Sequence, residues 1–258
     1  MKQPKPSQVA SWSQPLLIAL QFLTRIPMPD IGRVENSIVG RSLLFYPLVG
    51  LFIGCALWLT QLALQGLMPG AWSVQAALLL SVWCLLTGGL HLDGLADSAD
   101  AWVGGFGDRD RTLALMKDPT CGPAAVMVLV LLLLVKFSAI ASLIAAAPEW
   151  LIVAPVVARA MLLLLFLTTD YVRAGGLGNV LAGSFPRQQA RYLLGSLALL
   201  LALLCGAVGV AILLSCLVLF AGLRYLMIER IDGTTGDTAG ALVELSEAMV
   251  LLAVLASL

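Results

Sequence analysis

The stretch GPAAVMVLVLLLLVKFSAIASLIAA, residues 122–146, decides the fold class, because it is apolar apart from two serines and the single charge of Lys136. A helix that crosses a bilayer needs roughly 20 consecutive, mostly apolar residues, and this stretch is long enough. The whole chain agrees: 60% of its 258 residues are hydrophobic, 12% are charged, and the mean hydropathy is +0.98. The sequence therefore predicts an integral membrane protein.

Outward from this stretch, other apolar runs of similar length lie on both sides. The predicted spans are residues 42–66, 72–92, 122–146, 150–168, 192–207, 208–228 and 238–257. The fifth and sixth of these share a glycine-containing turn near residues 206–209 and form a predicted hairpin. An earlier run, residues 16–26, has only about 11 residues, so we expect it to lie in the membrane interface.

We therefore predict an all-α fold: a polytopic transmembrane helical bundle of about seven spans with an N-terminal interfacial helix. The chain is expected to form a single integral membrane domain over residues 1–258, with 1–41 as an N-terminal segment and 42–258 as the bundle. No small-residue cleavage pattern follows the first apolar run, so we expect no cleaved signal peptide. Five cysteines without a C-x-x-C pair predict neither a disulfide framework nor a thiolate metal site.

The charged residues give the orientation. If the N-terminus is placed inside, 13 of the 15 Lys and Arg residues fall in inner segments, and the other two, Lys136 and Arg159, lie within spans. No outer segment then holds a Lys or Arg, in accord with the positive-inside rule. Of the 15 acids only Glu149 falls outside, which that rule does not require. We therefore expect the chemistry at the cytoplasmic face, and a net charge of zero gives no reason to expect a nucleic-acid partner.

Three aspartates follow the second predicted span, which we expect to continue without a break into HLDGLADSADAW, residues 91–102. Asp93, Asp97 and Asp100 are spaced i, i+4 and i+7, so they share one helical face. Carboxylates at this spacing repel one another unless a cation lies among them, and hard oxygen ligands suit Mg²⁺. The alternative is a solvated acidic face at the membrane surface. His91 is either a general base for a hydroxyl nucleophile or an interfacial histidine bonded to a carboxylate.

The segment DRDRTLALMKD, residues 108–118, could bind phosphate through Arg109 and Lys117, while Asp118 could add a metal ligand. The alternative for its charged start is a salt-bridged surface helix. Asn179, in the glycine-rich segment 171–184, could donate to phosphate or sugar, although the segment could also be an ordinary loop.

Four ionisable residues fall within predicted spans. Glu244 and Glu247 lie in the last span, where such residues usually face a functional interior, although both could instead snorkel to the interface. Lys136 and Arg159 need anionic partners, either buried carboxylates or phosphate, and Lys136 could instead snorkel outward. Arg159 is therefore a candidate substrate contact.

Carboxylates for Mg²⁺, basic side chains and glycine-rich loops at a membrane surface are typical of phosphoryl transfer. The order D-G-x-x-D-x-x-D in residues 93–100 is reminiscent of CDP-alcohol phosphotransferases, but the D-x-x-D-G-x-x-A-R signature is absent. Two further classes of protein also place charges in a membrane. One is a transporter, which would hold its site near mid-membrane, and the second is a non-catalytic scaffold.

Six motifs carry a closer resemblance over nearly the whole chain. They are FLTRIPMP (22–29), FYPLVG (45–50), LLTGGLHLDGLADSADA (85–101), RDRTLALMKD (109–118), GLGNV (176–180) and TTGDTAGALVELSE (234–247). In this order and spacing the chain resembles the adenosylcobinamide-GDP ribazoletransferase family, also called the cobalamin synthases. The resemblance implies a multi-pass enzyme of the bacterial inner membrane that joins adenosylcobinamide-GDP to α-ribazole, or its 5′-phosphate, with Mg²⁺ and releases GMP.

The residue patterns and the resemblance together give the predicted roles of particular residues. Asp93, Asp97 and His91 are the predicted catalytic residues, and Arg109, Lys117, Asn179 and Arg159 the predicted substrate contacts. The predicted metal ligands are Asp93, Asp97, Asp100, Asp118, Glu244 and Glu247. One departure is local: Thr120 stands where the family usually has an arginine. The expected partners are the two substrates, the lipid bilayer, and either a second copy of the chain or other enzymes of cobalamin synthesis.

Overall fold

The computed structural model describes residues 13–29, 32 and 34–258. Over these residues the regular structure is helical, apart from an isolated parallel bridge between Tyr171 and Thr234. The predicted all-α fold is therefore confirmed. Lys2, Lys5 and Arg33, which the predicted topology places inside, lie outside the described residues.

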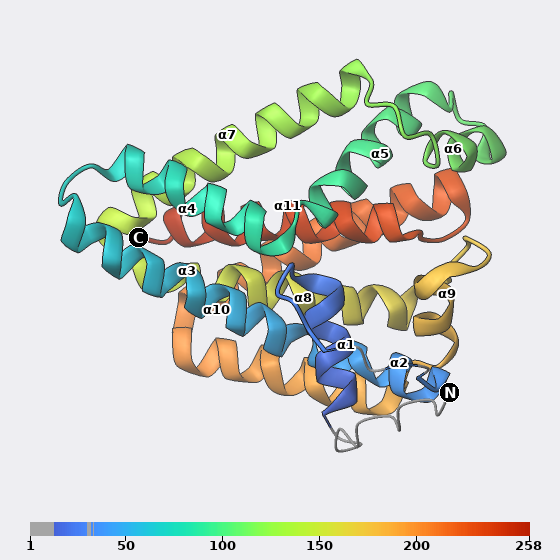
Figure 1. Cartoon of the computed structure of the whole chain (residues 1–258), viewed down its shortest axis with the longest axis horizontal. Helices are drawn as coiled ribbons and strands as arrows, with labels where there is room; N and C mark the ends of the chain where they lie inside the picture. The colour runs from blue at the N-terminus through green and yellow to red at the C-terminus, as the bar shows by residue number, and fades with distance from the viewer. Residues whose placement is uncertain (1–12, 30–31, 33) are drawn as a thin grey trace, which may run out of the picture.

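The long helices lie side by side and form a bundle (Figure 1). The elements are α1 (Gln14–Leu23), α2 (Asn36–Ser42), α3 (Tyr46–Leu67), α4 (Trp72–Thr87), α5 (Leu90–Gly104), α6 (Arg109–Leu115), α7 (Pro123–Ala146), α8 (Val153–Thr168), α9 (Gly176–Gly183), α10 (Arg187–Ile231) and α11 (Gly236–Leu255), with 3-10 turns at Leu43–Phe45 and Pro148–Leu151. Within the described residues, five helices are long and apolar enough to cross a membrane, and the bent pair of α4 and α5 makes a sixth. The short helices α2, α6 and α9 gather at one end of the bundle, and the C-terminus lies at the other (Figure 1).

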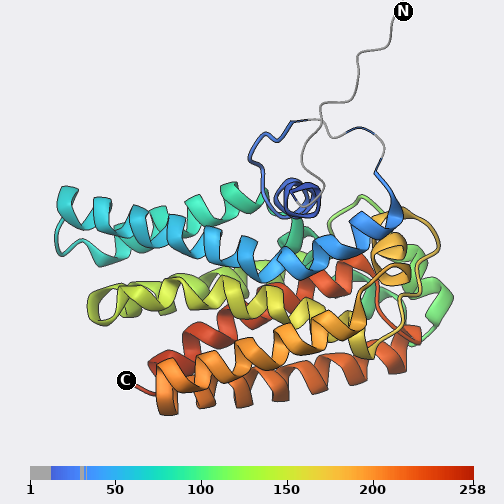
Figure 2. The same ribbon diagram turned by 90° about the horizontal axis from the view of Figure 1, so that it is seen from below.

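Helix α10 is a hairpin of two arms. Its backbone leaves the helical region at Gly206, which has φ 54° and ψ −131°. A Cβ atom added to Gly209 would collide with the carbonyl oxygen of Leu201, a residue that a straight helix would hold about 12 Å away. The chain therefore reverses here, and the two arms run side by side (Figure 2). Counting the arms separately turns six candidate spans into the seven expected from the sequence.

The second predicted span was expected to continue without a break into residues 91–102. This prediction is wrong, because the helix is interrupted. Gly88 and Gly89 adopt φ values of 66° and 68°, so α4 ends there in left-handed backbone and α5 starts in a new direction. The two helices meet at 88°. The face that carries the three aspartates therefore belongs to a separate helix.

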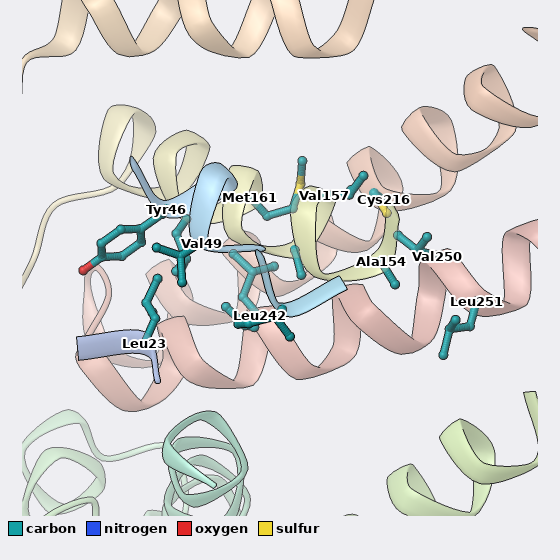
Figure 3. Close-up of a cluster of buried hydrophobic side chains, with 14 of the residues drawn as sticks. Leu23, Tyr46, Val49, Ala154, Val157, Met161, Cys216, Leu242, Val250 and Leu251 are labelled. Carbon is teal, nitrogen blue, oxygen red and sulfur yellow. The ribbon is translucent and has the colours of Figure 1, made fainter. Parts of the chain in front are cut away.

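The main hydrophobic core lies between α3, α8 and α11. Val49, Met161 and Leu242 contribute to it from these three helices, and Cys216 joins it from the second arm of α10 (Figure 3). The N-terminal helix α1 lies beside α3, where Figure 2 shows it end-on, and buries Ala19 and Leu23 completely. Whether α1 lies in the membrane interface stays a prediction.

Candidate functional site

The acidic face of α5 lines a pocket of about 470 Å³. Asp93, Asp97 and Asp100 contribute from α5, Arg25 from the segment after α1, and Thr120 from the connection between α6 and α7. Gly88 and Gly89 also line it, so the pocket lies against the break between α4 and α5. Three segments that are distant in sequence thus meet around the predicted aspartates.

Asp100 differs from the other two aspartates because its carboxylate caps a helix. Its Oδ2 accepts a hydrogen bond from the backbone N–H of Gly122 at 2.5 Å, and its Oδ1 accepts one from Ala125 at 3.0 Å. N–H groups at the start of a helix lack partners within that helix, and here the Asp100 carboxylate satisfies two of them. A Cβ at Gly122 would lie 2.7 Å from Oδ1 of Asp100, so this contact needs glycine.

Seven residues along a helix correspond to a rise of about 10 Å, so a single ion cannot contact both Asp93 and Asp100. In agreement, no three His, Cys, Asp or Glu side chains of the described residues are gathered closely enough to hold one metal ion. Mg²⁺ usually takes one or two carboxylates together with water and substrate phosphates. Asp93 and Asp97, one turn apart, match that smaller set.

Asp237 is a fourth carboxylate of this region, and the predicted ligand set lacks it. A Cβ at Gly94 would lie 2.8 Å from the carbonyl oxygen of Asp237, so α5 and α11 cross at very close range. Asp237 interacts electrostatically with Asp93 and Asp97 and forms an ion pair with Arg173 at 3.0 Å. Asp237 belongs to the TTGDT motif, which is visible in the sequence. The motif alone does not predict that α11 crosses α5 at this point.

The start of α11 is fixed by a capping box. The Thr235 hydroxyl accepts from the backbone N–H of Thr238 at 3.3 Å, and the Thr238 hydroxyl accepts from that of Thr235 at 2.9 Å. This pattern satisfies two N–H groups at the helix start. It holds Asp237 in the first turn, beside α5.

Asp118 lies next to the pocket and is exposed. Its Oδ1 accepts hydrogen bonds from the backbone N–H and the hydroxyl of Thr120, at 2.9 and 2.6 Å. These bonds favour the ionised carboxylate, so they hold the pKa of Asp118 below its ordinary value. The side chain itself does not line the pocket, whereas Pro119, Thr120 and Cys121 do.

The predicted substrate contacts Arg109, Lys117 and Asn179 are exposed and do not line the pocket. Arg109 forms ion pairs with Asp232 at 3.0 Å and Asp110 at 3.2 Å. The charged start of α6 therefore has the geometry of the salt-bridged surface helix that was the alternative. The roles of Lys117 and Asn179 in substrate binding stay predictions.

The four ionisable residues within spans form one buried ion-pair network. Nζ of Lys136 lies 2.6 Å from Glu244 and 2.5 Å from Glu247, and Arg159 pairs with the other oxygen of Glu247. The exposed fraction of each residue is 4% or less. Lys136 also lies over the ring of Trp83, 4.6 Å from its centroid, so it does not snorkel outward. Lys136 and Arg159 were expected to pair with either buried carboxylates or phosphate, and in the structure they pair with carboxylates.

Glu244 and Glu247 do not line the pocket. Both carboxylates already face a cation, so in this arrangement they hold α7 and α8 to α11 rather than a ligand. Their role as metal ligands, and that of Arg159 as a substrate contact, stay predictions without a place in the pocket.

His91 lies in the first turn of α5 and close enough to the ion-pair network to interact with its charges. A Cβ at Gly240 would be 3.2 Å from its Cα, so the start of α5 also packs closely against α11. The imidazole is buried, interacts electrostatically with Arg159 and Glu247, and has no hydrogen-bond partner for Nδ1 among the described residues. Its predicted catalytic role stays a prediction, since it does not line the pocket.

Fold and site together define a multi-pass helical membrane protein with a carboxylate-lined pocket beside a broken helix. Residues 15–255 match the family model described as cobalamin-5-phosphate synthase, and the chain belongs to this family. The family resemblance found in the sequence is therefore confirmed.

Relatives of high identity carry one name, adenosylcobinamide-GDP ribazoletransferase. The protein of that name from Pseudomonas syringae pv. syringae (strain B728a) is 56% identical over 240 residues, which cover 92% of this chain and 97% of the relative. Those from Pseudomonas fluorescens (strain Pf0-1) and Stutzerimonas stutzeri (strain A1501) are each 54% identical over 239 residues, covering 92% of this chain and 97% and 96% of theirs. No solved structure matches the chain.

Proposed function

We propose that this protein is an adenosylcobinamide-GDP ribazoletransferase, which joins adenosylcobinamide-GDP to α-ribazole or its 5′-phosphate. This is the last assembly step of cobalamin biosynthesis. The observation that carries the proposal is the pocket, because it gathers Arg25, Asp93 and Asp97 from two of the motifs on which the family resemblance rests. The near-full-length identity to relatives of that name supports it.

The reaction is a phosphoryl transfer without redox change. A hydroxyl oxygen of ribazole forms a bond to the phosphorus attached to the cobinamide arm. The bond from that phosphorus to the oxygen of GMP breaks, GMP leaves with the electron pair, and the hydroxyl proton is released. The protein must therefore orient a diphosphate, offset its charge and accept a proton.

The residues present fit Mg²⁺. Asp93 and Asp97 offer hard carboxylate oxygens on one helical face inside the pocket, and substrate phosphates can complete the coordination. When bound, the ion supplies charge neutralisation for the diphosphate. Asp100 is held as a helix cap, so we assign the ion to Asp93 and Asp97, with Asp118 as a further candidate. Asp93 and Asp97 are also the pocket carboxylates to which we assign acceptance of the hydroxyl proton.

We infer that the pocket faces the cytoplasm of a bacterial cell, at the inner membrane. The one-sided distribution of Lys and Arg supports this orientation. A second copy of the chain, or another enzyme of the pathway, stays a predicted partner, which co-purification would test.

The decisive experiment is turnover by the purified protein with adenosylcobinamide-GDP, α-ribazole and Mg²⁺, followed by release of GMP and formation of cobalamin. We expect product from the wild type and a large loss of turnover with Asp97→Asn. Turnover should not change with Glu149→Gln, because Glu149 is an exposed acid that does not line the pocket. A folded wild type without product would refute the function. Full activity of Asp97→Asn would refute the assigned site.

A further inference from the structure

We propose that Arg25 binds the diphosphate of the nucleotide-activated substrate. The inference rests on the proposed function for the identity of that substrate. It starts from the charges of the pocket, where carboxylates line α5 and Arg25 is the only Lys or Arg among the described lining residues.

The side chain of Arg25 has no ion-pair or hydrogen-bond partner among the residues that the structure describes. This side chain is exposed. It shares a pocket with three aspartates and yet lies beyond the 4 Å limit of an ion pair with any of them. The space between these opposite charges suits an anionic group beside the guanidinium, with Asp93 and Asp97 as the residues that would hold Mg²⁺.

The backbone of Arg25 is held in place. Its N–H donates to the carbonyl oxygen of Leu86 at 2.8 Å, which ties the segment after α1 to the last turn of α4. Leu23 is fully buried, and the hydroxyl of Thr24 donates to Leu20 at 2.7 Å. The attachment point of the guanidinium is therefore fixed before substrate arrives, which lowers the entropy lost on binding.

The side chain is directed by the break between α4 and α5. A Cβ at Gly88 would collide with Nε of Arg25 and lie 2.7 Å from its Cδ, so the arginine stem crosses the space that glycine leaves open. The break thus does two things: it turns α5, which carries the aspartates, and it admits the arginine beside them. A guanidinium can then contact two phosphate oxygens at once, which a lysine ammonium cannot do in the same way.

The test is binding of adenosylcobinamide-GDP in saturating Mg²⁺ without ribazole, compared with adenosylcobinamide, which lacks the nucleotide. Arg25→Met keeps the apolar stem against Gly88 and removes the charge. We expect it to weaken adenosylcobinamide-GDP binding roughly 10- to 100-fold, with adenosylcobinamide unaffected. Arg25→Lys should lose less, and the affinity of Arg25→Met should depend less on salt than that of the wild type.

Arg41→Met is the matched control, because Arg41 is an exposed arginine of the neighbouring helix α2 that does not line the pocket. In turnover, Arg25→Met should raise KM for adenosylcobinamide-GDP and leave KM for α-ribazole unchanged. Equal affinity of wild type and Arg25→Met for adenosylcobinamide-GDP overturns the inference, as does an equal loss for adenosylcobinamide. If Arg25→Met does not fold, Arg25→Gln replaces it, and wild-type affinity of that uncharged variant for adenosylcobinamide-GDP overturns the inference.

Failure of the proposed function would look different, because then the wild type itself gives no GMP. In that case inorganic pyrophosphate with Mg²⁺ is the probe. Weaker pyrophosphate binding by Arg25→Met than by wild type supports the role of Arg25, and equal binding overturns it.

Discussion

Asp100 binds the first turn of α7 through Gly122: its Oδ2 accepts the backbone N–H of Gly122 at 2.5 Å, while Oδ1 accepts that of Ala125. These two bonds join the second half of α5 to the start of the next long helix, α7. They thereby close the connection that carries Asp118 and Thr120 beside the pocket. One of three neighbouring aspartates therefore maintains the shape of the site, while the other two remain available to a ligand.

Asp100→Ala is expected to lower the free energy of unfolding by about 1 kcal/mol, the usual effect of removing a helix cap. Asp97→Asn should abolish most turnover and leave the thermal midpoint in detergent near that of the wild type. Thermal unfolding and GMP release on the same preparations separate the two roles. Wild-type stability of Asp100→Ala together with lost turnover would contradict the capping role.

Gly94→Ala should destabilise the protein by about 1 to 3 kcal/mol, because the new methyl group would be forced against the carbonyl oxygen of Asp237. The strain separates α5 from α11, so turnover should fall as well. Gly222→Ala is the matched control: nothing lies within 4 Å of a Cβ there, and alanine is favoured over glycine in a helix by roughly 0.5 to 1 kcal/mol. Equal stability of the two variants would argue against a close crossing.

Lys136→Met should destabilise the bundle by about 3 to 5 kcal/mol, since it leaves an uncompensated buried carboxylate. The double variant with Glu244→Gln restores neutrality and should recover a large part of that loss. Thermal midpoints of the wild type, both single variants and the double variant form the required cycle. Additive losses would show that Lys136 and Glu244 do not act as a pair.

Thr120→Val should raise the pKa of Asp118, because it removes the hydroxyl, one of the two donors that stabilise the carboxylate. In the wild type the depressed pKa keeps Asp118 ionised to lower pH. The variant should therefore take up its proton at higher pH as acid is added. Carbon NMR of the labelled carboxyl, without added metal, reports the titration, and identical curves would contradict the assignment.

Local patterns predicted what lies within one helix or one loop. The spacing of Asp93, Asp97 and Asp100 predicted their common helix, and the glycines near Gly206 predicted the hairpin. The break at Gly88 and Gly89 was also visible as a glycine pair, but the apolar run around it favoured a continuous span. Only the left-handed conformation of both residues shows how sharply the chain turns.

What the sequence could not supply is the choice among partners that are distant along the chain. The sequence motif that contains Arg25 gave it no role, since nothing local places Arg25 beside aspartates that lie four helices later, on α5. The cations Lys136 and Arg159 required carboxylate or phosphate, and charge alone does not decide between them. The packing of α11 against α7 and α8 does decide, because it brings Glu244 and Glu247 into contact with both.

The buried network also sets an order of assembly. The ribosome makes α7 and α8 first, and Arg159 precedes its partner Glu247 by 88 residues. Until α11 has been synthesised and inserted, the nascent protein holds two cations in the membrane without the carboxylates that neutralise them. A chain that ends before α11 leaves Lys136 and Arg159 without Glu244 and Glu247, so its interior stays incomplete.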